Sequence, residues 1–490
     1  MLFNSYTFVF LFLPIVWIGF QLIGGRGHHR VAVTWLVTAS LFFYGWWNPA
    51  YLGLILASML FNYALGTQLH SSENSLRARK LLLLLGLSAN LTLLGYYKYA
   101  GFFIENLNQL LESPLSFDAV LLPLAISFFT FQQLAYLVDA YRGETREYNF
   151  LQYCLFVTFF PQLIAGPIVH HKEMMPQFLN EACYRYDAKK VAQGLCLFVL
   201  GLFKKVVVAD QLSLYVQQVF TAADQGVLLS PLEAWYGALS YTFQLYFDFS
   251  GYADMALGIA LLFGITLPIN FNSPYKARNI IDFWRRWHIT LSRFLRDYIY
   301  IPLGGNRRGE WRRLQNVLAT MLLGGLWHGA GWTFVIWGGI HGLMLTLNHL
   351  WQGLWAKSGL TAIPRPLAAA LGWLLTFTAV VFAWVVFRAE SLDSAVAIWQ
   401  AMLGLNPLSD GQSYFYNDLF RKSLTVTKWL VCLIIAVLLL PNSLQFVGLK
   451  SGARRLRLQP TLFWALLIAG LALTAILKMN NVSEFLYFRF

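Results

Sequence analysis

Runs of about twenty apolar residues recur along the chain, and a helix of that length crosses the roughly 30 Å hydrocarbon core of a membrane. The runs lie at residues 5–24, 31–47, 50–68, 80–99, 119–139, 150–168, 191–212, 316–353, 368–387, 425–445 and 460–479. The run at 316–353 is long enough for two helices, and a further apolar stretch at 231–265 is interrupted by charge. The polar loops are short, the longest near residues 405–424. We predict an all-α polytopic membrane protein with about eleven to thirteen spans, built as a single membrane domain over residues 1–490.

Composition supports the same class of protein. Hydrophobic residues make up 58% of the chain and charged residues only 12%, and the mean hydropathy is +0.54. A soluble globule could not cover that much apolar surface. The formal net charge of +13 fits Lys and Arg gathered in cytoplasmic loops beside anionic phospholipid headgroups. The excess of basic residues is therefore explained without a nucleic-acid partner.

The first apolar run and the four cysteines support two further predictions, one on the N-terminal span and one on the state of the thiols. Residues 1–25 lack the positive start and the small-residue cleavage site of a secretory signal, and Arg26 and Arg30 follow them. We expect an uncleaved first span with its N-terminus outside. The four cysteines are widely spaced, without a CxxC pattern or paired histidines, so we expect ordinary buried thiols, no disulfide framework and no metal site.

Two apolar segments contain residues that interrupt a plain span. Residues 159–167 (FFPQLIAGP) place two prolines and a glycine inside an apolar run, which predicts a broken or re-entrant helix buried in protein or lining a cavity. Residues 244–258 carry Asp248 and Asp254 in an apolar setting. Carboxylates there face a cavity or a partner, or they are interfacial or held by structural bonds, and the sequence leaves these alternatives open.

Residues 279–313 form the most basic part of the chain. A helical projection of this segment predicts one amphipathic helix. Its apolar arc contains Ile281, Trp284, Leu291 and Leu295, and its opposite face contains Arg285, Arg286, Arg293 and Arg296. His288 falls at the edge of the apolar arc. The arginine face can bind lipid headgroups at the membrane surface, or hold the phosphates of an acyl carrier, and both can hold at once.

His328 lies inside the apolar run 316–353, with Gly324, Gly325, Gly329 and Gly331 around it. A helix that starts near Asn316 would carry His328 about 18 Å along its axis, close to the middle of a membrane. A lone buried histidine can be a neutral imidazole satisfied by a carbonyl group. Flanking Trp327 and Trp332 favour instead an aromatic-walled space in which the imidazole acts as a base. His341 and His349 have no metal-ligand spacing, and we expect structural or interfacial roles for them.

Five strings in the sequence resemble one family of membrane enzymes. They are FFPQLIAGPI (159–168), QLYFDFSGYADMALG (244–258), residues 270–307, MLLGGLWHGAGWTFVIWGGIHG (321–342) and FLYFRF (485–490). The sequence resembles the membrane-bound O-acyltransferase (MBOAT) family, in the bacterial branch with the membrane subunit of alginate O-acetylation and the D-alanyl transfer protein of teichoic acid. The resemblance implies a ring of tilted and broken transmembrane helices around a central tunnel. It also maps the family's tunnel histidine onto His328 and its second, bacterial-type histidine onto His288.

The resemblance implies an O-acetyltransferase of the bacterial inner membrane. Acetyl-CoA would donate acetyl at the cytoplasmic mouth, with His328 as general base or transient acetyl carrier and His288 orienting the donor or assisting proton movement. From their charge, and not from the resemblance, we infer that the anionic nucleotide is recruited with the help of Arg285, Arg286, Arg293 and Arg296. An extracytoplasmic polysaccharide acetyltransferase is the expected partner, and alginate, cellulose or another exopolysaccharide is the expected final acceptor.

Two other functions are compatible with the same residues. A proton-coupled exporter could use Asp248, His288 and His328 as a relay, and a non-catalytic scaffold could organise a polysaccharide export complex. The lack of internal repeats and the five strings count against the exporter. The presence of both histidines counts against the scaffold.

Overall fold

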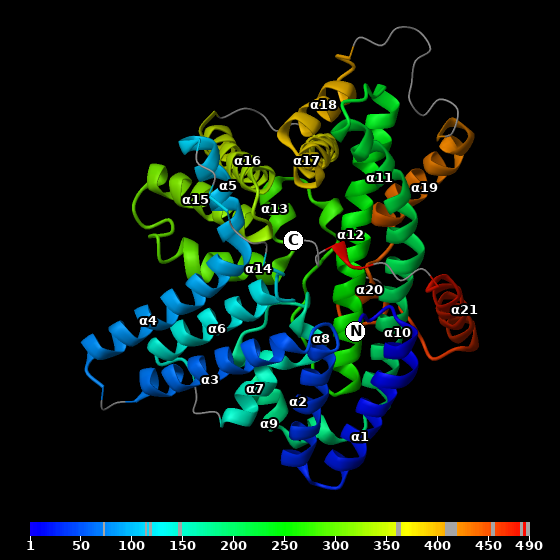
Figure 1. The fold of residues 1–490 in the computed structure, drawn as a ribbon. Helices are drawn as coiled ribbons and strands as arrows, with labels where there is room; N and C mark the ends of the chain where they lie inside the picture. Colours follow the sequence, from blue (N-terminus) through cyan, green and yellow to red (C-terminus); the bar gives the residue numbers. More distant parts are fainter. Residues whose placement is uncertain are drawn as a thin grey trace. The chain divides into compact units, whose positions relative to one another are not determined.

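The protein is described by a computed structural model that covers residues 1–71, 74–112, 115–116, 120–145, 149–358, 364–406, 419–451, 456–480 and 484–486. Within these ranges every regular element is a helix, and the α-helices are labelled in Figure 1, so the predicted all-α class is confirmed. Most of the polar loop predicted at 405–424 and the end of the string 485–490 lie outside the described residues.

The chain divides into two compact units. Unit 1 comprises Met1–Leu202, Tyr252–Ile269 and Leu466–Arg489, and unit 2 comprises Phe203–Gly251, Asn270–Ala465 and Phe490. The helices before the first boundary are η1 (Phe8–Phe12), α1 (Leu13–Gly25), α2 (His29–Gly45), α3 (Ala50–His70), α4 (Leu76–Leu94), η2 (Gly95–Tyr99), α5 (Ala100–Leu111), α6 (Ile126–Tyr141), α7 (Phe150–Thr158), α8 (Phe160–Leu163), α9 (His171–Leu179), η3 (Glu181–Tyr184) and α10 (Ala188–Phe203).

The remaining helices belong mainly to unit 2. They are η4 (Lys204–Ala209), α11 (Asp210–Asp224), α12 (Pro231–Leu262), η5 (Pro274–Lys276), α13 (Ile280–Trp284), α14 (Ile289–Leu295), η6 (Arg296–Tyr300), α15 (Glu310–His328), α16 (Trp332–Ser358), α17 (Arg365–Arg388), α18 (Leu392–Met402), α19 (Leu419–Leu439), α20 (Ser443–Phe446) and α21 (Leu462–Lys478). The end of α12 and most of α21 belong to unit 1.

Several helices have the length and composition of membrane spans. Among the described residues, five helical segments are long and apolar enough to cross a bilayer: Phe8–Gly25, Ala50–His70, Leu76–Leu111, Ala188–Asp224 and Arg365–Arg388. Leu424–Leu439 and Leu462–Lys478 are shorter apolar helices. These segments agree with the predicted polytopic arrangement, while the count of about eleven to thirteen spans stays a prediction.

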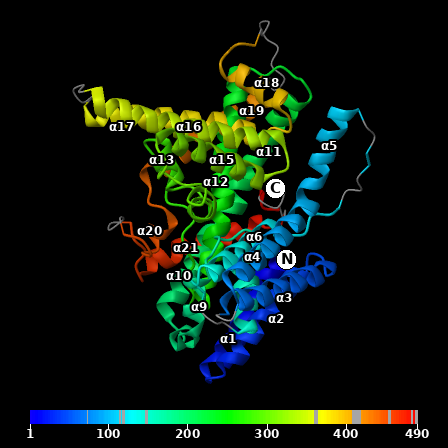
Figure 2. The same cartoon turned by 90° about the vertical axis from the view of Figure 1, so that its left-hand side faces the viewer.

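In unit 1, α6 packs against both α3 and α4, and the three helices run side by side in Figure 2. Buried amide side chains join them. The Asn62 Nδ2 group donates to Asn90 Oδ1 at 3.2 Å, the Asn90 Nδ2 group donates to Asn62 Oδ1 at 2.7 Å, and Asn62 also bonds to Gln133 on α6. Hydrogen bonds between membrane helices supply attraction that apolar packing alone does not, because lipid is as apolar as leucine.

The break predicted at residues 159–167 is confirmed. Helix α7 ends at Thr158, and the four-residue helix α8 is followed by an irregular segment up to α9. All residues from 159 to 169 are buried, and the Phe160 amide donates to Ser40 Oγ on α2 at 3.2 Å. Irregular backbone at this position is thus satisfied by protein, as a membrane interior requires.

Asp248 is one half of a buried ion pair. Lys205 Nζ lies 2.7 Å from Asp248 Oδ1 and 2.9 Å from Asp210 Oδ1, and the side chains of Lys205 and Asp248 are each only 2% exposed. Lys205 lies in η4, a π-helical stretch between α10 and α11. Of the alternatives that the sequence left open, structural bonding therefore holds for Asp248, while Asp254 is buried in unit 1.

The cysteine expectation was only partly right. Cys154 and Cys183 are buried, Cys196 is half-buried and Cys432 is exposed, and all four are free thiols. Cys432 lies on α19, one of the shorter apolar helices. The spacing of the cysteines bears on disulfides and metal sites and does not determine burial, which is why the exposure of Cys432 was not predicted.

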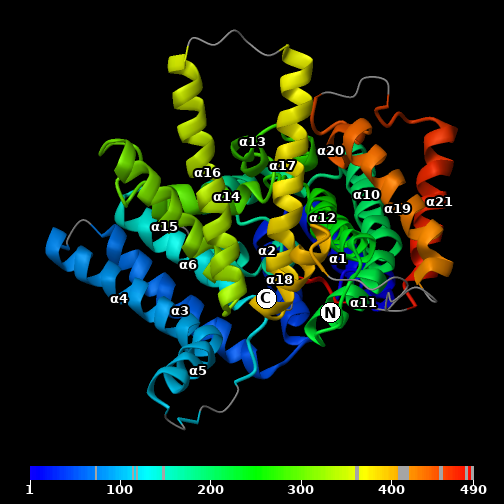
Figure 3. The same cartoon turned by 90° about the horizontal axis from the view of Figure 1, so that it is seen from above.

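Helices α15 and α16 form the tightest helix pair in unit 2 and lie side by side in Figures 1 and 3. The run at 316–353 thus contains two helices, as predicted. Glycines allow the close approach: a Cβ atom at Gly325 would overlap the Phe334 carbonyl oxygen, and one at Gly338 would overlap the Met321 carbonyl oxygen. Small residues permit such backbone contact between helices.

We predict that Gly325→Ala and Gly338→Ala each lower the free energy of unfolding by about 1–3 kcal/mol, because the added methyl group overpacks a backbone contact. Thermal unfolding of the purified protein in detergent measures the effect. Gly353→Ala on α16 is the matched control, since a Cβ atom there meets nothing within 4 Å. It should leave the melting temperature unchanged or raise it slightly. Equal melting temperatures for all three variants would contradict the proposed packing.

Candidate active site

The basic segment is not one amphipathic helix, and that prediction was wrong. Helix α13 ends at Trp284, and α14 begins at Ile289. Between them His288 has φ +40° and ψ +54°, the left-handed conformation that non-glycine residues rarely adopt. The helical projection therefore fails beyond Trp284. His288 is fully buried at the break and does not lie at the edge of a continuous helical face.

Asn270 holds the break in place through its backbone and side chain. The Ile289 amide donates to the Asn270 carbonyl oxygen at 3.0 Å, and the Thr290 amide and hydroxyl donate to Asn270 Oδ1 at 3.3 and 3.0 Å. Residues kept in sparsely populated backbone conformations need such surrounding bonds, and they cluster at functional sites. The unusual backbone at His288 thus has an identifiable support.

The same asparagine sets the tautomer of His288. His288 Nδ1 lies 3.0 Å from Asn270 Oδ1. Because a backbone amide can only donate, the bond from Thr290 fixes the Asn270 oxygen on this side. His288 Nδ1 therefore carries the proton, and Nε2 is the acceptor nitrogen of the neutral ring. Burial lowers the pKa of His288 to about 3, so the ring is neutral at ordinary pH.

His328 is the last residue of α15 and is 4% exposed. The helix begins at Glu310 and not near Asn316, so the predicted start of the helix was wrong. The chain leaves the helix at Gly329, whose backbone is extended. Glycine suits this position, because a Cβ atom there would overlap the ring of Phe334. His328 therefore marks the buried turn between α15 and α16.

Aromatic side chains surround His328, although partly different ones from those expected. The centroid of its ring lies 4.9 Å from Trp327, 5.1 Å from Trp337 and 5.2 Å from Phe387. Trp332, which was expected in the wall, is 55% exposed. Trp337 is on α16 and Phe387 is on α17. Their proximity to His328 therefore depends on tertiary packing, which spacing in the sequence does not reveal.

The two histidines come together in unit 2. Their ring centroids are 6.4 Å apart, and Trp327 lies 6.1 Å from His288 and 4.9 Å from His328. Phe249 of α12 packs edge-on against His288 at 4.8 Å. Two imidazoles from different elements thus share one aromatic environment that is buried away from bulk water.

The four arginines are divided among three elements. Arg285 is exposed and Arg286 half-buried in the break, Arg293 is half-buried in α14, and Arg296 is exposed at the start of η6. Two of them face carboxylates: Arg286 Nε lies 2.8 Å from Asp282 Oδ1, and Arg296 Nε lies 2.7 Å from Asp297 Oδ1. A role for these arginines in holding the acyl donor stays a prediction.

Two lysines add positive charge beside Arg286, and sequence reasoning missed them. Burial and then the nearby Arg286 charge lower the pKa of Lys276, and the same two causes lower the pKa of Lys450. Lys276 also donates to the Leu440 carbonyl oxygen at 2.8 Å. The lysines lie 174 positions apart in the sequence, so no local pattern could have grouped them.

The sequence profile of the membrane-bound O-acyltransferase family matches residues 31–387, most of the chain. The chain belongs to this family. It is 48% identical to a peptidoglycan O-acetyltransferase of Helicobacter pylori, over 84% of this chain and 81% of the relative. It is 41% identical to a probable alginate O-acetylase AlgI of Pseudomonas aeruginosa, over 87% and 78%. A probable alginate O-acetylase AlgI of Pseudomonas putida is 38% identical over the full length of both chains.

Family membership and the apolar helices identify a multi-pass membrane acyltransferase, as predicted. An acyltransferase of this family uses an acyl donor and an acceptor. Among the described residues, no group of three or more His, Cys, Asp and Glu side chains is arranged to hold a metal ion.

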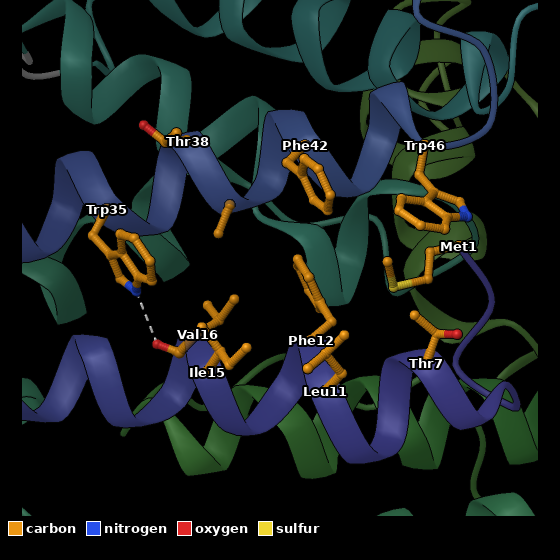
Figure 4. A pocket seen from close by; sticks show the side chains of 11 residues that line it. Met1, Thr7, Leu11, Phe12, Ile15, Val16, Trp35, Thr38, Phe42 and Trp46 are labelled. Carbon is orange, nitrogen blue, oxygen red and sulfur yellow. Dashed lines mark hydrogen bonds between the residues drawn. The ribbon is translucent and has the colours of Figure 1, made fainter.

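A cavity of about 340 Å³ in unit 1 lies between η1–α1 and α2 (Figure 4). Its wall is mostly apolar and aromatic, with Phe12, Phe42 and Trp46 among its residues, and the Trp35 indole donates to the Val16 carbonyl oxygen at 3.0 Å beside it. None of the histidines or arginines predicted for the site lines this cavity. The side chains that line this cavity include no group that could act as a base in acyl transfer.

We predict that His288→Gln reduces the acid sensitivity of this acyltransferase. The folded-state pKa near 3 lies below the ordinary value of about 6.5. Between these two pH values the imidazole of His288 is protonated in the unfolded chain and neutral in the folded chain. This residue therefore lowers stability as pH falls through about 6.5. The fall in melting temperature from about pH 7 to pH 5 should be smaller in His288→Gln than in the wild type.

The exposed His70, at the end of α3, provides the control for this measurement. His70→Gln should show the same fall in melting temperature as the wild type. If His288→Gln also showed the wild-type fall, the buried neutral state of His288 would be wrong.

Proposed function

We propose that the protein is an inner-membrane O-acetyltransferase that passes acetyl groups from cytoplasmic acetyl-CoA toward a carbohydrate polymer outside the membrane. Alginate, cellulose, another exopolysaccharide or peptidoglycan are candidate polymers, because named relatives include alginate O-acetylases and a peptidoglycan O-acetyltransferase. The observation that carries the proposal is the meeting of His288 and His328 in one buried aromatic site.

The proposed architecture is a single functional membrane domain over residues 1–490. About eleven to thirteen tilted and broken spans would surround a tunnel that joins the two sides of the membrane. The basic cluster of Arg286, Lys276 and Lys450 supports a cytoplasmic donor mouth, because Lys and Arg favour the cytoplasmic side. Arg285, Arg293 and Arg296 extend the same positive segment and would bind phosphates of the donor.

The reaction is an acyl transfer in which His328 acts as base or as transient carrier. As a base, it takes the proton of an acceptor hydroxyl while the hydroxyl oxygen bonds to the thioester carbonyl carbon. The carbon–sulfur bond then breaks, and CoA leaves as the thiol with that proton. As a carrier, the imidazole nitrogen bonds to the carbonyl carbon while the carbon–sulfur bond breaks, and CoA leaves as the thiol with the ring proton. The hydroxyl oxygen then takes the acetyl group from the nitrogen, and the hydroxyl proton returns to the ring. Base catalysis typically contributes about 10²–10⁴-fold, and positioning contributes further.

His288 is proposed to orient the reactants. Its low pKa makes it a poor proton acceptor, whereas the lone pair on Nε2 can receive a hydrogen bond from a hydroxyl or from the His328 ring. Because Asn270 fixes the direction of that lone pair, the imidazole can orient without changing its charge. This favours positioning over proton relay for His288.

A separate extracytoplasmic acetyltransferase is the proposed partner and would deliver acetyl to the polymer. The exporter alternative loses one of its relay groups, since Asp248 is paired with Lys205, which also bonds to Asp210. The scaffold alternative gives no reason to bury two histidines side by side.

Replacing His328 tests the function directly. We expect His328→Ala and His328→Gln to abolish transfer of radiolabelled acetyl from acetyl-CoA, because neither side chain can take the proton or the acetyl group. Both variants should insert into the membrane and keep a melting temperature near that of the wild type. Near-normal transfer by His328→Gln would overturn both catalytic roles.

His349→Gln is the matched control for this test. His349 lies farther along α16 and is half-buried, and it has no assigned part in the chemistry. We expect His349→Gln to transfer acetyl at close to the wild-type rate. A comparable loss in both variants would indicate a general effect of replacing histidines in this helix pair.

A further inference from the structure

His341, on α16, lies in the same aromatic cluster as His328 but has no part in the mechanism described above. It is fully buried, and its ring centroid lies 4.8 Å from Trp337, which in turn lies 5.1 Å from His328. Trp337 and His341 are four residues apart on one helix and therefore share a face. The ring of Trp337 thus contacts both histidines.

The tautomer of His341 follows from its partner on α13. The Trp284 indole Nε1 lies 3.3 Å from His341 Nδ1. An indole N–H can only donate, so His341 Nδ1 accepts and the neutral ring carries its proton on Nε2. His341 Nε2 is therefore a hydrogen-bond donor, the reverse of the arrangement in His288.

Two buried donors on this face lack acceptors. Within the described part of the chain, His341 Nε2 and Trp337 Nε1 have no hydrogen-bond partner, and both side chains are at most 1% exposed. Buried polar groups are nearly always hydrogen-bonded, and an unmatched one in a native protein calls for an explanation. The two unmatched donors belong to rings whose centroids lie 4.8 Å apart, in the aromatic cluster that contains His328. An oxygen atom of a bound reactant would supply the acceptor that they lack.

We propose that Trp337 Nε1–H and His341 Nε2–H form a two-donor site for the carbonyl oxygen of the acyl group. This inference rests on the proposed acetyl transfer. When the nucleophile bonds to the carbonyl carbon, the electron pair of the C=O bond moves onto that oxygen. When the carbon–sulfur bond breaks, the pair returns and the thiolate leaves with the proton. Fixed donors in a dry site stabilise the negative charge that develops between these two events.

Trp284 has a positioning role in this arrangement. Its indole keeps the proton of His341 on Nε2, and it lies on α13, directly before the break that contains His288. One short helix thus fixes the donor nitrogen of His341 and leads into the segment that carries His288. The tautomers of two rings are thus assigned, and their Nε2 atoms have opposite hydrogen-bonding roles. Nε2 of His288 accepts, and Nε2 of His341 donates.

The test compares two substitutions of His341 that differ in the nitrogen they imitate. The amide of asparagine reaches the position of Nδ1, so His341→Asn keeps an acceptor for Trp284 and loses the second donor. The amide of glutamine reaches the position of Nε2, so His341→Gln keeps a donor. Trp337→Phe keeps an aromatic ring and removes its N–H. Trp373→Phe on α17 is the control, since that indole already donates to the Tyr275 carbonyl oxygen at 2.9 Å.

Steady-state transfer of acetyl from acetyl-CoA by the purified full chain supplies the readout. We expect His341→Asn and Trp337→Phe each to lower kcat by about 10²–10³-fold, the effect of losing one such donor, with KM for acetyl-CoA nearly unchanged. His341→Gln should recover much of the loss, and Trp373→Phe should match the wild type. A general packing defect would lower the melting temperature and would not distinguish asparagine from glutamine.

The outcomes separate this inference from the proposed function. If the wild type transfers acetyl and His328→Gln does not, while His341→Asn and Trp337→Phe keep the wild-type kcat, the two-donor site is wrong and the acetyltransferase assignment stands. Equal losses in His341→Asn and His341→Gln would also overturn the donor role. If the wild type transfers no acetyl from acetyl-CoA, the proposed function fails first.

Discussion

The close contact between α15 and α16 is the constraint on which the rest of the site depends. Gly325 and Gly338 allow the two backbones to meet, and side chains larger than hydrogen would separate them. The turn that follows places His328 at the buried end of α15 and brings Trp337 against it. Without that contact, neither the aromatic wall nor the donors of α16 would face the histidine.

The second constraint is the hydrogen bonding that defines each imidazole. The bond from His288 Nδ1 to Asn270 leaves Nε2 of His288 as a hydrogen-bond acceptor. The bond from Trp284 to His341 Nδ1 leaves Nε2 of His341 as a donor. Neutral imidazoles with fixed tautomers can bind a hydrogen-bond donor at one ring and an acceptor at the other. Neither ring then places a net charge in the apolar environment. In the proposed acetyl transfer, His288 would orient a hydroxyl group, and His341 would stabilise the negative charge that develops on the carbonyl oxygen. Both proposed roles depend on the hydrogen bonds that Asn270 and Trp284 make to the two rings.

Much of this could be predicted from sequence, and the failures have physical causes. Prolines and glycine predicted the break after Thr158, and the apolar runs predicted an all-helical membrane protein. Helical periodicity failed at His288, because Asn270, eighteen residues earlier, stabilises a backbone conformation that no local pattern signals. The start of the helix that carries His328 was predicted too late, because α15 begins directly after Gly309, at a φ of +84°, and not near Asn316. Trp337 and Phe387 were missed because only tertiary packing brings them to His328.

The most direct test of this account is the position of the donor in the protein. A structure of the full chain with an acetyl-CoA analogue that cannot be cleaved would locate the acyl carbon relative to His328. A reactive arrangement requires the reacting atoms about 3–3.5 Å apart. We expect the carbonyl carbon within that range of a His328 nitrogen or of a hydroxyl bonded to it, with the carbonyl oxygen facing Trp337 and His341. An analogue bound with its acyl group outside this aromatic cluster would contradict the assignment of the site.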